Sequence, residues 1–343
     1  MLRYLAWLFG TFCLLVLLIA GALYYGYSQF IGPGPSTAET TVVVPRGSKL
    51  GDIGALLEKA GVIRNAQLFE LGARIYAVGH GLQAGEYDFP AAASQQQVVD
   101  MMAAGRTVVR RLTVPEGLTV PEILELVRGA PGLDGDPPDP EAVAEGTLMP
   151  ETYFYSWGDG RKAMVERMGA AMRKEMAELW AGRAAKLGVD TPKAAVVLAS
   201  IVEKETAVPA ERPRIAAVFY NRLARGMKLQ SDPTVIYALT DGKGPLGRPL
   251  THADLDTASP YNTYLNAGLP PAPIGNPGRA SLEAVLHPAD TRELYFVADG
   301  TGGHAFAATL EEHNRNVARW RKLAPAAGAT APAAGAPAAA TSP

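Results

Sequence analysis

Two glutamates close an apolar stretch in the second half of the chain. Residues 196–208 read VVLASIVEKETAV, so Glu203 and Glu205 follow a run of apolar or small residues. A carboxyl group buried in an apolar wall keeps its proton to a higher pH, which suits it to general acid catalysis near neutrality. A glutamate at a helix end is also commonly a solvated residue with no catalytic role. This stretch alone leaves both interpretations open.

Helix geometry separates the two glutamates. In the helix expected over residues 192–205, Glu203 lies on the face of Ala199 and Ser200. Glu205 lies about 200° around the axis, because each residue turns an α-helix by about 100°. The two carboxylates therefore cannot act as one catalytic pair, and we expect one of them to face a cleft.

Further polar and aromatic residues follow this helix. Gln230 and Asp232 precede a helix that starts with proline, and Tyr261, Asn262 and Tyr264 lie in a long Pro-rich loop. Aromatic faces and amides are typical of a sugar-binding cleft, so we predict these five residues as substrate contacts. The structural alternatives are an N-cap role for Asp232 and loop packing for the tyrosines.

Other kinds of catalytic site have no matching motif in the sequence. There is no GxSxG, Walker or HExxH motif, and we expect His304 to be structural. The single cysteine, Cys13, cannot form an intramolecular disulfide, and no His/Cys spacing fits structural zinc. A net charge of −2 gives no basic surface for nucleic acid. We therefore expect a reaction without metal or cofactor.

The elements around Glu203 are predicted to be mainly helical. A helix over 162–187 carries a methionine at every fourth position from Met164 to Met176, which is typical of core packing. A second helix over 212–225 is closed by Gly226, and ELYFVA at 293–298 indicates a late strand. The second half is therefore a helical domain with a small strand element.

The first half contains two segments of similar sequence, which we call the two copies of an internal echo. VPRGSKLGDIGALL begins at Val44 and VPEGLTVPEILELV begins at Val114, an offset of 70 residues. Each copy predicts a strand, a Pro-x-Gly turn and a short amphipathic helix, and a further strand is expected over 82–90. Duplication and the recurrence of a common turn remain equally open. The predicted fold class is α+β.

The N-terminal region predicts a membrane helix. Residues 4–27 are mainly apolar and long enough to cross a bilayer, and a cleaved signal peptide is the alternative. Residues 1–3 then form a cytoplasmic stub whose positive charge places the rest of the chain outside the cytoplasm. Residues 28–39 are expected to be a linker, and the Ala/Pro-rich residues 324–343 a disordered tail.

Long strings of this sequence resemble the YceG-like endolytic murein transglycosylases. The resemblance covers about residues 40–323 and the N-terminal apolar run. The strings that carry it, in order, are VPEGLTVPEI, LMPETYFY, LASIVEKETAV, ERPRIAAVFYNRLARGMKLQSDPTVIYAL, YNTYLNAGLPPAPIGNPGRASLEAVLHPA and LYFVADGTGGHAFAATLEEHN.

This resemblance implies a single-pass protein of the bacterial inner membrane with a periplasmic catalytic domain. It implies LysM-like modules over 40–130 and a catalytic domain over 131–323 that cuts peptidoglycan glycan strands internally. The family's role implies that it ends nascent strands near the peptidoglycan synthases, the penicillin-binding proteins. The family's catalytic glutamate corresponds to Glu203, and Glu205 is a lesser possibility.

The implied chemistry needs one carboxyl group. The acid protonates the glycosidic oxygen, the muramyl 6-hydroxyl attacks its own anomeric carbon, and the same glutamate takes the hydroxyl proton. The product is a 1,6-anhydromuramyl end. If Asp232 also reaches the bond, a hydrolase with two carboxylates is the alternative. A glycan-binding scaffold without activity is the alternative from another class.

Overall fold

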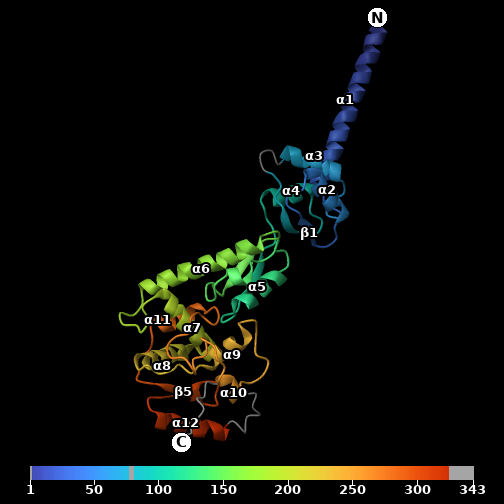
Figure 1. Cartoon of the computed structure of the whole chain (residues 1–343). Helices are drawn as coiled ribbons and strands as arrows, with labels where there is room; N and C mark the ends of the chain where they lie inside the picture. The colour runs from blue at the N-terminus through green and yellow to red at the C-terminus, as the bar shows by residue number, and fades with distance from the viewer. Residues whose placement is uncertain (1, 77–80, 324–343) are drawn as a thin grey trace. The chain divides into compact units, whose positions relative to one another are not determined.

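A computed structural model describes residues 2–76 and 81–323 of the chain, so the predicted tail at 324–343 lies outside the described residues. The chain divides into two compact units (Figure 1). The first comprises residues up to Arg111 together with 131–134 and 154–159, and the second comprises the remaining residues.

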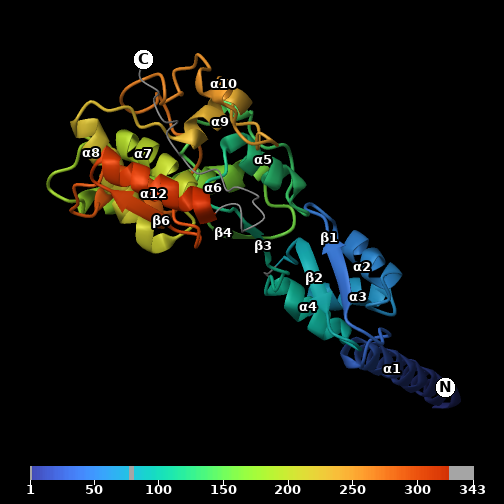
Figure 2. The ribbon, with the colours of Figure 1, turned by 90° about the horizontal axis from the view of Figure 1, so that it is seen from below.

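The first unit combines a two-stranded sheet with helices, as the α+β prediction requires. Strand β1 pairs antiparallel with β2, with Thr40 opposite Phe89 and Val44 opposite Gly85. The apolar side of this ribbon packs against helices to form a core of its own (Figure 2). The elements are α1 (Leu2–Ile31), β1 (Thr40–Val44), α2 (Leu50–Lys59), α3 (Ala66–Tyr76), β2 (Gly85–Phe89) and α4 (Gln95–Ala103).

Helix α1 is longer than the predicted membrane segment. It continues to Ile31, so residues 28–31 are helical where the sequence predicted a linker, and Pro33 follows as a residue that cannot continue a helix. The side chain of Phe30 is 3% exposed, and its ring lies 5.3 Å from that of Tyr76. Residues Tyr4–Ile31 are long and apolar enough to cross a membrane, and none of the apolar window is buried.

The two copies of the echo share one local structure. Strand β1 leads to α2 in the first copy, and β3 (Arg110–Thr113) leads to α5 (Val120–Gly129) in the second. The turn glycines Gly47 and Gly117 have φ angles of +80° and +79°, a conformation that glycine adopts without strain. The strand, turn and helix predicted for each copy are therefore confirmed.

The helix starts of the two copies also match. In each copy the acidic residue three positions after the N-cap accepts a hydrogen bond from the N-cap N–H. Asp52 accepts from Lys49 at 3.2 Å, and Glu122 accepts from Thr119 at 2.9 Å. This half of the capping box satisfies one of the free N–H groups of a helix start.

The second unit is mainly helical, as predicted. Its core surrounds α7, which packs against α8 and α11, and the four predicted methionines of α6 are buried. The helices are α5, α6 (Arg161–Ala181), α7 (Pro192–Glu205), α8 (Arg212–Ala224), α9 (Asp232–Thr240), α10 (His252–Leu255), α11 (Arg279–Leu286) and α12 (Leu310–Leu323), with short 3₁₀ turns at Pro140–Ala142 and Pro209–Glu211.

Two small sheets complete the chain. Strands β3 and β4 (Thr152–Tyr155) pair with each other, and β5 (Tyr295–Ala298) pairs antiparallel with β6 (His304–Ala307). The late strand β5 was predicted. Strand β6 was missed because the glycine-rich segment before it, residues 299–303, is typical of a loop. Helix α6 ends at Ala181, before the predicted end at 187, and its C-cap is Gly182, a residue with low helix propensity.

Candidate active site

Glu203 lies in the last turn of α7, and residues at the starts of α8 and α11 bind its carboxylate. Its side chain is 6% exposed. Oε1 accepts a hydrogen bond from Nη2 of Arg212 at 3.1 Å, and Oε2 accepts one from the N–H of Gly278 at 2.9 Å. Arg212 begins α8, and Gly278 is the N-cap of α11, so the carboxylate is fixed in direction at both oxygens.

Ser200, one turn before Glu203, holds the same loop. Its Oγ accepts a hydrogen bond from the N–H of Ile274 at 3.0 Å and donates to the carbonyl of Val197 at 2.7 Å. The loop from Ile274 to Gly278 is therefore fastened to α7 at two points, through Ser200 and Glu203. The predicted shared face of these two side chains is confirmed.

The Pro-x-Gly turn of the second echo copy closes another side of the site. The N–H of Gly117 donates to the carbonyl of Asn276, and the N–H of Asn276 donates to the carbonyl of Leu118, both at 2.8 Å. A Cβ atom at Gly275 would lie 2.6 Å from the carbonyl oxygen of Gly117, so the close approach requires glycine there.

This turn brings a second carboxylate, Glu116, to the site. Its Oε2 lies 3.4 Å from Nη2 of Arg212, the atom that also binds Glu203. The two carboxylates therefore share one guanidinium nitrogen. Burial and the neighbouring charge of Glu203 raise the pKa of Glu116, and Arg212 opposes this rise.

Glu116 and Arg212 were missed by the sequence analysis. Their signal was present in the Pro-Glu-Gly turn of the echo and in the arginine that opens α8, but neither stands near Glu203 in a recognisable spacing. Gly278 was missed as well. A Cβ atom at Gly278 would lie 1.8 Å from Oε1 of Glu116, so this glycine makes room for the second carboxylate.

Glu205 faces a different part of the unit, as the helix geometry predicted. It is buried and accepts a hydrogen bond from Oγ of Ser231 at 2.5 Å. Burial raises the pKa of Glu205 to about 7, against the lowering effect of the Ser231 hydrogen bond. Glu203 and Glu205 therefore have separate partners.

Three of the predicted contact residues gather near Glu205. Asp232 is the first residue of α9, while Ser231 is the N-cap, so the alternative of an Asp232 N-cap is wrong. The hydroxyl of Tyr264 donates to Oδ1 of Asp232 at 2.5 Å, and burial raises the pKa of Asp232. Oε1 of Gln230 accepts a hydrogen bond from Arg222 at 3.4 Å.

The other two predicted residues lie in one loop but have different surroundings. The ring of Tyr261 lies 4.8 Å from the ring of Tyr237. Asn262 is fully buried, and its Nδ2 donates to the carbonyls of Leu255 and Thr257, both at 2.9 Å. The amide of Asn262 thus holds the loop together.

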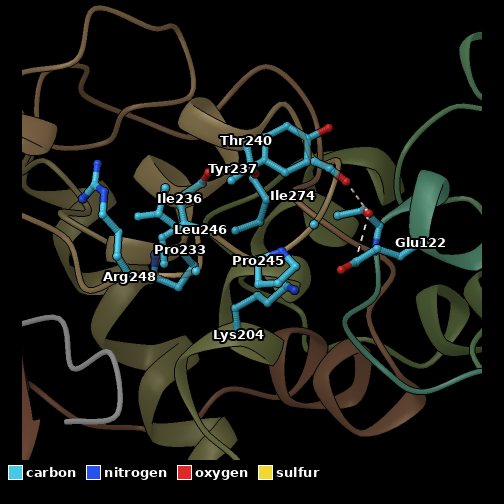
Figure 3. A pocket seen from close by; sticks show the side chains of 14 residues that line it. Glu122, Lys204, Pro233, Ile236, Tyr237, Thr240, Pro245, Leu246, Arg248 and Ile274 are labelled. Carbon is cyan, nitrogen blue, oxygen red and sulfur yellow. Dashed lines mark hydrogen bonds between the residues drawn. The ribbon is translucent and has the colours of Figure 1, made fainter. Parts of the chain in front are cut away.

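A pocket of about 370 Å³ adjoins the active-site residues (Figure 3). Its wall includes Tyr237, Ile274 and Lys204, the residue after Glu203. It combines aromatic and aliphatic surfaces with a few polar groups, as small-molecule pockets generally do. The full lining is Thr119, Glu122, Lys204, Pro233, Ile236, Tyr237, Thr240, Gly242, Gly244, Pro245, Leu246, Gly247, Arg248 and Ile274.

Two further groups near these elements have structural partners. Glu145 accepts hydrogen bonds from the N–H of Val120 and from Nδ2 of Asn276, and burial raises its pKa to about 7. Nδ1 of His304 lies 2.7 Å from Oε2 of Glu211, in agreement with the predicted structural role of this histidine.

The chain is similar to several known proteins. A model of the YceG-like family matches residues 42–319. The chain is 33% identical over 335 residues to the endolytic murein transglycosylase of Bacillus subtilis (strain 168), covering 87% of this chain and 90% of that protein. It is 31% identical over 359 residues to the protein of that name from Streptococcus pneumoniae serotype 2, covering 90% of this chain and 64% of the relative.

A solved structure supports the same relationship. A YceG-like protein of Listeria monocytogenes, known from a crystal structure at 2.6 Å, matches with a TM-score of 0.50 and 33% sequence identity. The match covers 82% of this chain and 99% of that one.

Proposed function

Because the chain belongs to the YceG-like family, we propose that it is an endolytic murein transglycosylase, a lyase that cuts peptidoglycan glycan strands internally and leaves 1,6-anhydromuramyl ends. The observation that carries this proposal is the fixed carboxylate of Glu203. Arg212 and the N–H of Gly278 hold it in one orientation beside a pocket.

Glu203 performs both proton transfers in this reaction. Its carboxyl group gives a proton to the glycosidic oxygen as the bond between that oxygen and the anomeric carbon breaks. The muramyl 6-hydroxyl then bonds to the anomeric carbon and returns its proton to Glu203. Between the two steps Glu203 is an anion, and Arg212 and the N–H of Gly278 stabilise this charge.

The pocket supplies a place for a sugar ring. Tyr237 offers an aromatic wall, and Tyr261 lies against it as a second ring. We assign substrate contact to Tyr237, which lines the pocket, and to Tyr261, whose ring lies against that of Tyr237. We propose Gln230, Asp232 and Tyr264 as further substrate contacts beside α9. Asn262, also predicted as a substrate contact, is fully buried, and its amide instead holds the loop through main-chain carbonyls.

The hydrolase alternative is less well supported. Hydrolytic glycosidases need two carboxyl groups, separated by about 5–5.5 Å in retaining enzymes and about 6.5–9.5 Å in inverting enzymes. Asp232 is bonded to Tyr264, and Glu116 is bonded to the same guanidinium nitrogen as Glu203, so neither is shown free to act as a second catalytic carboxylate. A scaffold without activity would not need the carboxylate orientation described above.

The N-terminal helix supports a proposed cellular setting. We place α1 in the bacterial inner membrane as a single span, with its N-terminus in the cytoplasm and the catalytic unit in the periplasm. An anchored endolytic enzyme near the penicillin-binding proteins would end nascent glycan strands. The 40–130 region would serve as the LysM-like, glycan-binding part.

The test compares Glu203→Gln with Glu205→Gln in the full chain in detergent, incubated with purified glycan strands. Mass spectrometry distinguishes anhydro ends from hydrolysed ends, because anhydro ends are one water lighter. E203Q should lose activity by a factor on the order of 10³, as expected for a general acid, while E205Q keeps it.

Each outcome selects one of the functions. Hydrated ends from the wild type would show a hydrolase, and an inactive but folded wild type would favour the scaffold. Cleavage that survives E203Q but not E205Q would move the catalytic role to Glu205.

A further inference from the structure

Helix α3 carries most of the exposed apolar surface that the first unit has outside α1. In the described part of this unit, five large apolar side chains beyond α1 are exposed, and three of them belong to α3. Leu71 is 57% exposed and Ile75 is 63% exposed, and Tyr76 is the third; the others are Val109 and Phe154. Exposed apolar side chains that gather on one helix mark a surface that a partner covers.

The apolar side chains of α3 form one stripe. Because each residue turns an α-helix by about 100°, Leu68, Leu71 and Ile75 lie within about 60° of one another. We call these three residues the apolar stripe. The buried Phe69 and Ala73 lie on nearly the opposite side of α3 and belong to the core of the unit. The stripe is therefore not the face by which α3 packs into its own unit.

A charged face separates the stripe from the core on one side. Glu70 and Arg74 are one turn apart and form an ion pair at 2.6 Å, in which the Arg74 side chain is largely exposed. A helix with a charged face next to an apolar face is typical of helices that lie in the interface of a membrane.

On its other side the stripe borders α1. A Cβ atom at Gly26 would lie 3.7 Å from Cδ1 of Leu68, so α1 passes directly beside the stripe. One turn later in α1, the ring of Phe30 occupies the space above Gly72. Helix α3 lies at the end of the first unit from which α1 leaves (Figure 1). The apolar stripe is thus continuous with the apolar surface of α1.

The depth of this contact is marked by tyrosines. Tyr24, Tyr25 and Tyr27 are exposed on α1, and tyrosines gather where a membrane meets water. Gly26, the neighbour of Leu68, lies between them in the chain. Helix α3 therefore begins at the depth of the membrane interface.

We infer that α3 is an interfacial helix, whose apolar stripe lies in the headgroup region of the periplasmic leaflet of the bilayer that α1 spans. This inference rests on the membrane placement of α1 in the proposed function. A lipid surface is the occupant that the contacts favour over a protein groove, because the stripe continues the exposed apolar surface of α1 at the level of its tyrosines. The chain then contacts the membrane through two elements.

The test places a fluorescent label on the stripe of the full chain. Ile75→Cys is combined with Cys13→Ser, which removes the single native cysteine, and the labelled protein is reconstituted in nanodiscs of phosphatidylethanolamine and phosphatidylglycerol. Lipids that carry a nitroxide quench the label on contact. A nitroxide near the headgroups should reduce the emission of I75C by about half, and one deep in the acyl chains should reduce it less, because interfacial helices reach only about 5–10 Å into the lipid.

Arg74→Cys, also with C13S, is the matched control. Residue 74 is the neighbour of Ile75 and is also exposed, but it lies about 100° away on the charged face. R74C should be quenched little by either lipid, whereas Leu71→Cys should behave as I75C does. Thermal unfolding of each variant checks that it is folded.

A label on α1 separates the inference from its premise. Leu17→Cys should be quenched most by the deep nitroxide. If L17C is quenched in this way but I75C and L71C match R74C, the inference is wrong and the stripe is left to a protein partner. An unquenched L17C would refute the membrane placement of α1 and the inference with it. The lytic activity is judged separately, by the anhydro ends that the wild type forms.

Discussion

At the scale of residues, two glutamates two positions apart in one helix have different partners. Glu203 is bonded to an arginine and a main-chain N–H, whereas Glu205 is buried and bonded to Ser231. The difference arises from the rotation of about 200° between these two positions of the helix. Glu203 therefore has a proposed catalytic role, whereas ionisation of the buried Glu205 lowers the stability of the fold.

The buried Glu205 predicts a pH-dependent stability. Its pKa of about 7 in the folded state lies above the ordinary value of 4.5, so the folded protein binds more protons than the unfolded chain between these values. The contribution of Glu205 to stability is therefore complete below about pH 4.5 and is lost as the pH rises through about 7. The loss for this one group is on the order of 2–3 kcal/mol.

Glu205→Gln should remove that loss, since glutamine stays neutral and can still accept from Ser231. We expect a smaller fall in melting temperature between pH 5 and pH 8 for E205Q than for the wild type. Glu145, whose pKa is also raised to about 7, contributes a fall of the same sign in both proteins. Parallel curves for the two proteins would contradict the assignment to Glu205.

Sequence reasoning reached the parts of this site that lie within one helix. The 3.6-residue period separated Glu203 from Glu205 and placed Ser200 beside Glu203, because helix faces are local. It could not find Glu116, which is 96 residues from Arg212 in the chain and joins it only through folding. A pairing between distant segments leaves no spacing to detect.

At the scale of elements, α7 binds the loop from Ile274 to Gly278, and this loop in turn orients Glu203 of α7. The hydroxyl of Ser200 is the partner of the buried N–H of Ile274. Removing it leaves that donor unsatisfied, which costs about 1–3 kcal/mol, and loosens the loop that positions Gly278 against Glu203.

Ser200→Ala should therefore lower both stability and kcat. The control is Thr191→Ala, which removes the N-cap of α7 at its opposite end. Loss of this cap should cost about 1 kcal/mol and leave kcat unchanged. Urea unfolding and the rate of anhydro-end formation measure the two effects, and equal kcat losses in both variants would contradict a specific role for the loop.

The predicted elements were most accurate where the signal was local. The Met-bearing helix, the strand–turn–helix copies and the late strand β5 all formed where the periodicity placed them. Besides the missed strand β6, the errors lie at ends, such as α1 continuing past residue 27, where Phe30 docks on α3 beyond the apolar run. Such packing is a tertiary effect that periodicity does not encode.

At the scale of the whole molecule, α1 carries the membrane assignment. The side chain of Leu17 is 70% exposed in the middle of the helix, as expected for a lipid-facing position. Leu17→Arg would place a charge near the bilayer centre, at a cost of about 2.5–3.5 kcal/mol on an insertion scale.

We expect L17R to reduce the share of protein that stays with membranes after carbonate extraction. The same change at Leu310, an exposed residue that begins α12, should leave membrane retention unaltered. The intact mass of the membrane-bound wild type should correspond to the uncleaved chain. A mature protein that lacks α1 would instead show a signal peptide.

The docking of Phe30 has a mechanical consequence for the first unit. The ring of Phe30 sits where any side chain at Gly72 would clash, and α1 passes into its own unit with its last turn packed on α3. With α1 in the bilayer, its packing on α3 and α4 would fix the orientation of the β1–β2 unit relative to the membrane helix. The anchor would then set the distance between the membrane surface and the β1–β2 unit.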